Sequence, residues 1–355
     1  MIDPKEPVEQ PSSRNDLTEN LAGQFFIYNH PEDDPSSQAT PNRQEDISPR
    51  DSPPNETEKL MSGVLPYDRL GRYKLLYELG RGGFGIVYRA YDEELKRSVA
   101  IKLPRNEAPA TQDQFDIYLE EARAIAELDH PNIIPVYDIG RLANHSFYIV
   151  SKFIDGECLS KVIQRGRLHF DEIVDVLLPL ADALSHIHKH KIVHRDLKPN
   201  NILLDQEGRP YLGDFGLAIR EHHQLIMNQV AGTPAYMSPE MARGEFHHLD
   251  GRSDLFSFGI IIYEMITGHR PFQGNKISEI LEKICQYDPV PPHILNDRLP
   301  PHLEKICLKC LAKHQSNRYQ MARELFQDLR NLQKELSHEK KTVVGPQPSA
   351  DSARS

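Results

Sequence analysis

The chain has 355 residues, of which 39% are hydrophobic and 26% charged, and its formal net charge at pH 7 is −10. That length allows about two domains of ordinary size. The acidic balance disfavours a nucleic-acid partner, because binding to a phosphate backbone depends on Lys and Arg. No apolar run approaches the roughly 18 residues of a membrane span, and the N-terminus lacks a basic-then-apolar signal. We therefore expect a cytoplasmic protein with no membrane span and no nucleic-acid partner.

Both ends of the chain differ in composition from the middle. Residues 1–69 hold 10 of the 27 prolines, and their 14 acidic against 6 basic residues give this segment a net charge of −8. Such a segment cannot bury enough apolar surface to offset chain entropy. We predict a disordered acidic tail over 1–69, a folded domain over 70–336 and a second disordered tail over 337–355.

A glycine-rich stretch lies near the start of the folded part. Residues 73–80 and 86–92 are rich in β-branched and aromatic residues, and they flank Gly-Arg-Gly-Gly-Phe-Gly at 80–85. The pattern predicts two strands joined by a loop whose backbone can approach phosphate oxygens closely. A dinucleotide-binding fold would need a helix directly after the glycines. Because residues 86–90 read as a strand, we favour a glycine loop that covers the phosphates of a nucleotide.

The next strand, at 99–102, carries a single lysine, Lys102. In isolation, a lysine that snorkels from an edge strand would be the ordinary interpretation. A helix is predicted over 112–128 from its apolar spacing, and Glu121 lies beside the apolar face, where an unpaired carboxylate would be costly. An ion pair between Lys102 and Glu121 satisfies both residues, although Glu120 is a competitor for the pairing.

The remaining pattern divides the domain into two lobes. Strands predicted over 133–140 and 146–152 complete a five-stranded N-terminal lobe with one helix, at 70–152. The C-terminal lobe, 155–336, is predicted to be mainly helical and begins with a long amphipathic helix over 171–190. Cys307 and Cys310 form a C-x-x-C, but no second pair or nearby histidine accompanies them at zinc-ligand spacing. Both cysteines match the apolar stripe of a helix, so we predict that they pack in the core.

Ten residues, Ile-Val-His-Arg-Asp-Leu-Lys-Pro-Asn-Asn at 192–201, carry the strongest chemical signal. Transfer of a phosphoryl group requires little covalent chemistry from a protein and a great deal of placement. Asp196 can accept a hydrogen bond from an attacking hydroxyl, Lys198 can sit on the moving phosphoryl group, and the amide of Asn201 can ligate magnesium. Asp-Phe-Gly at 214–216 follows a predicted strand, and in isolation it would be interpreted as a turn.

These motifs together resemble the protein kinases. The stretch 192–201 is similar to their catalytic loop, and Ser-Pro-Glu at 238–240 resembles the Ala-Pro-Glu that closes their activation segment, with serine in place of alanine. The resemblance covers about 72–333 and is greatest to bacterial members of the Ser/Thr family. It implies a bilobal α+β kinase fold and transfer of the γ-phosphoryl group of ATP, with Mg²⁺, to Ser or Thr hydroxyls of proteins.

The resemblance also implies roles for individual residues. Asp196 and Lys198 would be catalytic, while Asn201 and Asp214 would bind Mg²⁺. The residues expected to bind ATP are Leu79, Gly80, Arg81, Gly82, Gly83, Phe84, Gly85, Ile86, Val87, Ala100, Lys102, Glu121, Ser151, Lys152, Ile154 and Leu203. Ser151 is small for its position at the back of the nucleotide pocket, and we expect an unusually open pocket there. Asp254 is expected to hold the backbone of the catalytic loop, and Arg318 to pair with Glu240.

Two kinds of function fit these motifs: an active kinase, or a pseudokinase that binds nucleotide and serves as a scaffold. The lysine, the loop aspartate and the magnesium aspartate are all present, which favours the active enzyme. Residues 217–231 of the expected activation segment contain no Ser, Thr or Tyr. We therefore expect that Glu221, a homodimer or another partner, rather than a phosphate, orders this segment near Arg195. The serines and threonines of residues 1–69 are expected to be substrates of the enzyme itself, and the alternative is a disordered linker with no regulatory role.

Overall fold

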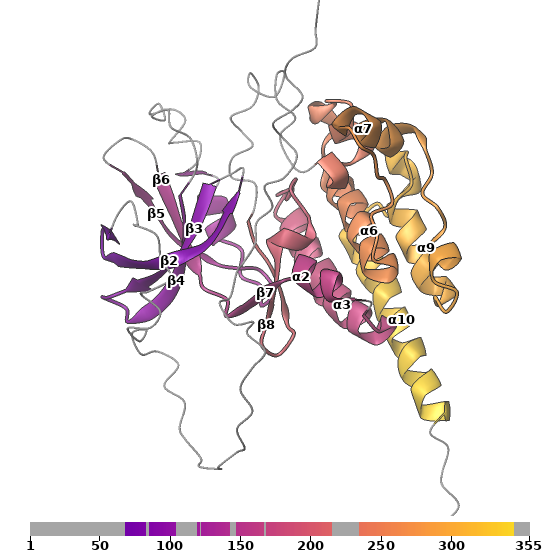
Figure 1. Ribbon diagram of the computed structural model, residues 1–355, viewed down its shortest axis with the longest axis horizontal. Helices are drawn as coiled ribbons and strands as arrows, with labels where there is room; N and C mark the ends of the chain where they lie inside the picture. Colours follow the sequence, from indigo (N-terminus) through magenta and orange to yellow (C-terminus); the bar gives the residue numbers. More distant parts are fainter. Residues whose placement is uncertain are drawn as a thin grey trace, which may run out of the picture.

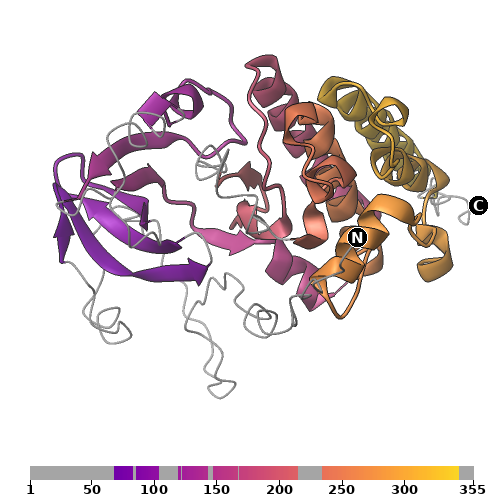
Figure 2. The ribbon, with the colours of Figure 1, turned by 90° about the horizontal axis from the view of Figure 1, so that it is seen from above.

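The computed structural model describes residues 68–82, 85–103, 119–120, 122–142, 147–166, 168–214 and 234–343. Within these ranges the chain forms two lobes, and Figure 1 shows a lobe of twisted sheet beside a larger lobe of helices. The view in Figure 2, turned by 90°, shows the same separation into two lobes. The predicted bilobal α+β architecture is therefore confirmed.

The N-terminal lobe is built on one antiparallel sheet. Its strands are β1 (Arg69–Leu70), β2 (Tyr73–Gly82), β3 (Gly85–Asp92), β4 (Arg97–Leu103), β5 (Val136–Arg141) and β6 (Phe147–Lys152), in the spatial order β1-β2-β3-β4-β6-β5. The two-residue strand β1 is added to the five that the sequence predicts. Along β4 the side chains of Val99, Ile101 and Leu103 are buried in the core of this lobe. Because successive strand residues point to opposite faces, Ala100 and Lys102 are directed to the other side.

The C-terminal lobe begins with a small sheet and continues with helices. The sheet has the order β7-β8-β9, with β7 at Gly156–Cys158, β8 at Ile202–Asp205 and β9 at Pro210–Leu212. The helices are α2 (Leu159–Arg165), α3 (Phe170–Lys189), α5 (Pro239–Ala242), α6 (Gly251–Thr267), α7 (Ile277–Gln286), α8 (Pro292–Leu295), α9 (Pro301–Cys310) and α10 (Ala322–Val343). Short 3₁₀ turns are η2 (Pro199–Asn201), η3 (Pro234–Tyr236), η4 (Phe246–His248) and η5 (Gln315–Asn317).

Helix α6 forms the centre of this lobe. Nearly all of its residues are buried, which explains why its sequence is apolar on every side. Helix α10 packs along α3, as Figure 1 shows, and contributes the buried leucines Leu325, Leu329 and Leu332. The core of this lobe therefore holds α3 in place, and the catalytic loop follows directly after α3.

Two boundaries differ from the prediction. Helix α6 begins at Gly251 with Asp250 as its N-cap, whereas the sequence predicts an apolar helix over 255–267 that Asp254 opens; Asp254 therefore lies within the first turn. Helix α10 continues to Val343, whereas the sequence led us to end the folded domain at residue 336. These last residues are mostly polar, so the apolar spacing that predicts a buried helix is missing from them.

Two further predictions concern the core and the membrane. Cys307 and Cys310 are fully buried in the core, as predicted, and burial raises the pKa of the Cys310 thiol to about 12. Among the helices that the structure describes, none is both long enough and apolar enough to cross a membrane.

Candidate active site

The polar side chains of the loop 194–201 form a compact hydrogen-bonded cluster. Lys198 Nζ donates to the Asp196 carboxylate at 2.7 Å, and Asn201 Nδ2 donates to the same oxygen at 2.9 Å. Asn201 Nδ2 also donates to the backbone carbonyl of Asp196 at 2.7 Å. All three side chains are buried. Since Asp196 is held from two sides, its carboxylate has a fixed direction before any substrate arrives.

The backbone of this loop is fixed by Asp254 on helix α6. The Asp254 carboxylate accepts hydrogen bonds from the backbone N–H groups of His194 and Arg195, each at 2.9 Å. Burial opposes ionisation of Asp254, but the hydrogen bond and charge of His188 and the backbone N–H of His194 outweigh it and lower its pKa. The role predicted for Asp254 is therefore confirmed.

Two residues of the site have a backbone conformation that costs energy. Arg195 has φ of +66° and Asp214 has φ of +56°, both in the left-handed region that favours glycine. A non-glycine residue held there carries strain of about 1–3 kcal/mol. The strain persists at Arg195 because its backbone N–H is bonded to Asp254. It persists at Asp214 because the preceding residue, Gly213, is held by a hydrogen bond between its carbonyl and His194 Nε2 at 3.0 Å. Arg195 directly precedes the predicted catalytic residue Asp196, and Asp214 is itself a predicted magnesium ligand.

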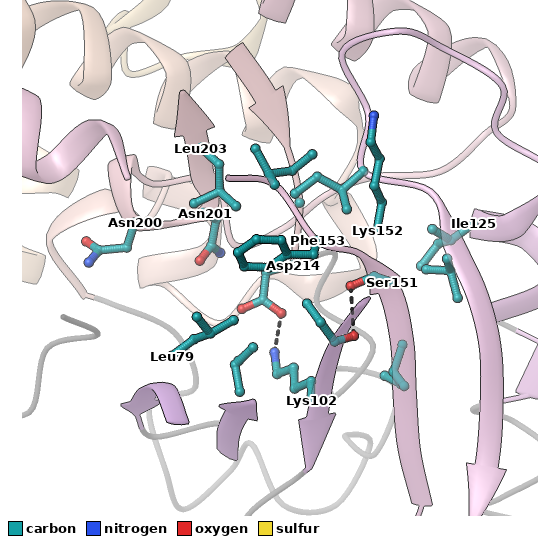
Figure 3. Close-up of a pocket in the computed structure, with 17 residues that line it drawn as sticks. Leu79, Lys102, Ile125, Ser151, Lys152, Phe153, Asn200, Asn201, Leu203 and Asp214 are labelled. Atoms are coloured by element: carbon teal, nitrogen blue, oxygen red, sulfur yellow. Dashed lines mark hydrogen bonds and ion pairs between the residues drawn. The ribbon is translucent and has the colours of Figure 1, made fainter. Parts of the chain in front are cut away.

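A pocket between the two lobes lies next to this loop. Figure 3 shows Lys102 and Asp214 pointing toward each other across it, and the two side chains form an ion pair. Burial raises the pKa of the Asp214 carboxyl, but the Lys102 ammonium and the charge of Lys198 outweigh this effect and lower it. The pocket is lined by Leu79, Val87, Ala100, Lys102, Ile125, Ile134, Val136, Ile149, Ser151, Lys152, Phe153, Ile154, Asn200, Asn201, Leu203, Gly213 and Asp214.

Ser151, on strand β6, lies in the wall of this pocket. The Ser151 hydroxyl donates to the backbone carbonyl of Ala100 on the adjacent strand at 3.5 Å, as the dashed line in Figure 3 marks. Its small side chain leaves Ile125, Val136 and Ile149 as part of the same pocket lining. Ser151 and these three apolar residues therefore line one pocket, and the unusually open rear pocket stays a prediction.

Several predicted nucleotide-binding residues lie away from this lining. Strands β2 and β3 form the predicted hairpin, in which Gly80 pairs with Val87, Arg81 with Ile86 and Gly82 with Gly85. Gly85 has φ of +138°, a conformation that a residue with a side chain would rarely adopt. The side chain of Arg81 forms an exposed ion pair with Glu78. Gly83, Phe84 and Glu121 lie outside the described residues, and so does the predicted ion pair of Lys102 with Glu121.

A buried ion pair joins helix α5 to the segment that follows η5. Arg318 donates to both carboxylate oxygens of Glu240, at 2.8 and 2.9 Å, and both side chains are almost completely buried. Burial raises the pKa of Glu240, but the bonds from Arg318 and from Ser253 reverse this effect and lower it to about 2. The pairing predicted for Arg318 is confirmed. The activation-segment residues 217–231 lie outside the described ranges.

Three residues of this site, His188, Phe153 and Asn200, were not predicted from the sequence. His188 Nε2 contacts the Asp254 carboxylate at 2.8 Å, although we had no role for the histidines of α3. Phe153 and Asn200 also line the pocket. Their positions in the chain, directly next to the predicted residues Lys152 and Asn201, were a signal for both. His188 gave no such signal, because its partner lies 66 residues away.

Comparison with known proteins agrees with this geometry. A family model described as the protein kinase domain matches residues 73–329. A probable serine/threonine-protein kinase of Clostridium acetobutylicum is 38% identical over 264 residues, which are 74% of this chain and 40% of that protein. Serine/threonine-protein kinase PrkC of Bacillus subtilis is 36% identical over 73% of this chain and 40% of its own length. PknB of Mycolicibacterium smegmatis is 34% identical over 82% and 47%. The chain thus matches less than half the length of each of these relatives.

Proposed function

This chain belongs to the protein kinase family, and we propose that it transfers the γ-phosphoryl group of ATP to Ser and Thr hydroxyls of proteins, its own included. One observation carries the proposal. The ion pair of Lys102 with Asp214 lines one pocket together with Asn201, and Asn201 bonds Asp196, which Lys198 also bonds. An acceptor group, two cations and two oxygen ligands are thereby available together, which is what phosphoryl transfer requires.

The chemistry of the pocket fits ATP and Mg²⁺. Asn201 uses its amide nitrogen to bond Asp196, so its amide oxygen and the Asp214 carboxylate are the two hard oxygen donors that Mg²⁺ prefers. Apolar side chains suited to an adenine ring come from both lobes, with Leu79, Val87 and Ala100 on one side and Leu203 on the other. Bound Mg²⁺ would neutralise charge on the phosphates.

We assign the following roles to the residues of the cluster. Asp196 accepts the hydrogen bond of the attacking hydroxyl and orients it. Lys198, which holds Asp196 at 2.7 Å, supplies positive charge where negative charge develops on the transferred group. Lys102 orients the phosphates of the nucleotide, and Asn201 and Asp214 hold the metal.

The substitution Asp196→Asn tests the proposal. We expect Mg-ATP binding to remain nearly intact, while phosphoryl transfer falls about a thousandfold, or roughly 4 kcal/mol of transition-state stabilisation. Transfer is measured with radiolabelled ATP and a generic basic protein substrate, and binding is measured by calorimetry. Turnover of the variant within tenfold of wild type would remove Asp196 from its role. A wild-type chain that binds Mg-ATP without any transfer would instead favour the pseudokinase scaffold.

We also propose a cytoplasmic location. All four cysteines are free thiols, which supports a reducing compartment. Protein substrates with Ser or Thr acceptors are the partners that this activity requires, and a homodimer is a further proposed partner that would order residues 217–231. A fractionation experiment with an antibody against the chain tests the location.

A further inference from the structure

Lys313 lies in an unusual environment behind helix α7. Its ammonium nitrogen donates to the carbonyl of Ile284 at 2.8 Å and to that of Lys283 at 3.3 Å. Both carbonyls belong to the last turn of α7, where helix carbonyls lack partners within the regular helix. The Lys283 carbonyl also accepts a hydrogen bond from the backbone N–H of the C-cap residue Tyr287 at 3.1 Å. A positive charge at this end of a helix is also favoured by the helix dipole. The Lys313 side chain thus caps α7 from another part of the chain.

Two aromatic rings complete this environment. The Lys313 nitrogen lies 3.9 Å from the ring centre of Phe272 and 5.7 Å from that of Phe256, and these rings are stacked with centres 6.2 Å apart. An ammonium at the face of an aromatic ring is attracted by the ring's electrons. Phe256 lies on α6, the buried centre of the lobe, so Lys313 connects α7 to that buried helix.

The backbone of Lys313 contacts Arg318, on the side away from α7. Its carbonyl accepts a hydrogen bond from Arg318 at 2.9 Å, and Arg318 holds Glu240. The Arg318 guanidinium also lies 4.8 Å from the ring centre of Phe256, the ring that Lys313 approaches. One residue therefore joins the Glu240 ion pair to the end of α7.

Helix α7 is only partly buried against the lobe. Of its ten residues, only Ile284 is buried. The helix nevertheless packs against η3 and α5, and the thiol of Cys285 donates to the carbonyl of Pro239 at 3.8 Å. Residues 234–242, which include η3 and α5, are the part of the kinase activation segment that the structure describes on the substrate side. A shallowly anchored helix thus supports the segment on which a protein substrate is expected to rest.

We propose that Lys313 is a positioning residue for protein substrates: by capping α7 beside the Phe272 and Phe256 rings, it fixes the helix that supports residues 234–242. This inference rests on the proposed kinase activity. Lys313 contacts neither the nucleotide pocket nor the catalytic cluster among the described residues. Its effect is therefore expected on recognition of the protein substrate and not on the chemical step.

The test compares Lys313→Met with Lys309→Met in the full chain. Lys309 is the matched control, because its nitrogen lies 3.8 Å from the ring centre of Tyr319 but caps no helix of the substrate side. With histone as the substrate, we expect Lys313→Met to raise KM for the protein about tenfold, while kcat and KM for ATP stay within twofold. Lys309→Met should leave all three constants within twofold. Equal effects of the two variants, or a fall in kcat alone, would overturn the proposal.

A second measurement does not depend on activity. Amide hydrogen exchange of residues 277–290 should become at least tenfold faster in Lys313→Met, while exchange in α6 and α3 is unchanged. Phe272→Leu removes one ring face but leaves both carbonyl bonds, so it should give a smaller change in the same residues. Unchanged exchange at α7 in both variants refutes the capping role, whether or not the chain is an active kinase. Absence of wild-type transfer would refute the proposed function alone.

Discussion

Replacing Asp254 by asparagine should separate the placement of the catalytic loop from its chemistry. The carboxylate accepts three hydrogen bonds, from His188 Nε2 at 2.8 Å and from the backbone N–H groups of His194 and Arg195 at 2.9 Å each. An asparagine offers one oxygen and one NH₂ group, so at least one of these donors meets another donor. Hydrogen bonds to charged groups contribute about 1.5–3 kcal/mol each, and losing one or two of them costs about 2–5 kcal/mol.

This loss is large against the roughly 5–15 kcal/mol that stabilises a typical domain, but it should leave the chain folded. The effect on catalysis should be clear, because Arg195 is strained and Asp196 follows it directly. A displacement of about 1 Å can reduce turnover about a hundredfold, so we expect kcat to fall by about 10- to 100-fold. Denaturant melts measure the stability, and single-turnover transfer of radiolabelled phosphate measures the chemical step.

The control is Asp250→Asn, on the same helix. Asp250 is the N-cap of α6 and accepts a hydrogen bond from the backbone N–H of Arg252 at 2.9 Å. Asparagine caps a helix about as well as aspartate does, so this variant should stay close to wild type in stability and in kcat. If Asp254→Asn retains both the wild-type melt and the wild-type kcat, the loop does not depend on Asp254 and the reasoning fails.

Two further predictions follow from the pocket and from the buried ion pair. Ser151→Met should fill the space in front of Ile125. Binding of adenine analogues with a bulky substituent on N6 should then weaken at least tenfold, while KM for ATP stays nearly unchanged. Equal binding of such an analogue to the wild type and the variant would contradict the open rear pocket. The pKa of Glu240 is lowered from 4.5 to about 2, so its pairing with Arg318 contributes stability that is fully present above about pH 4.5 and is lost as the pH falls through 2. The difference corresponds to roughly 3 kcal/mol. The free energies of unfolding of wild type and Glu240→Gln, from denaturant melts, should therefore differ by a constant amount above pH 4.5 and converge below it. A difference that does not change with pH would show that Arg318 does not lower the pKa of Glu240.

The sequence predicted the catalytic cluster well because its members are close together in the chain. Asp196, Lys198 and Asn201 lie within six residues, so their local spacing nearly fixes their geometry. Asp254 and Arg318 were predicted through family resemblance alone, because their partners lie 59 and 78 residues away. No periodicity or propensity reports such distant pairs.

What the sequence did not predict depends on tertiary contacts or on weak local signals. His188 on α3, which bonds Asp254, had no predicted role, because its position on the helix does not reveal that α6 lies against it. Strand β1 has only two residues, too few for an alternating pattern. The last turns of α10 are polar, so they lack the apolar spacing by which the end of a buried helix is recognised. Sequence patterns thus predict the elements better than their ends.

The packing of α10 on α3 has a consequence for the order in which the chain folds during synthesis. Helix α3 is made early in the C-terminal lobe, but the helix that covers it starts only at Ala322. Until Leu325 and Leu329 leave the ribosome, the apolar face of α3 that they cover is exposed to solvent. Exposed faces of this kind make nascent chains prone to aggregation. Fragments that end before α10 should therefore require a chaperone to remain soluble, even though they contain every residue of the catalytic cluster.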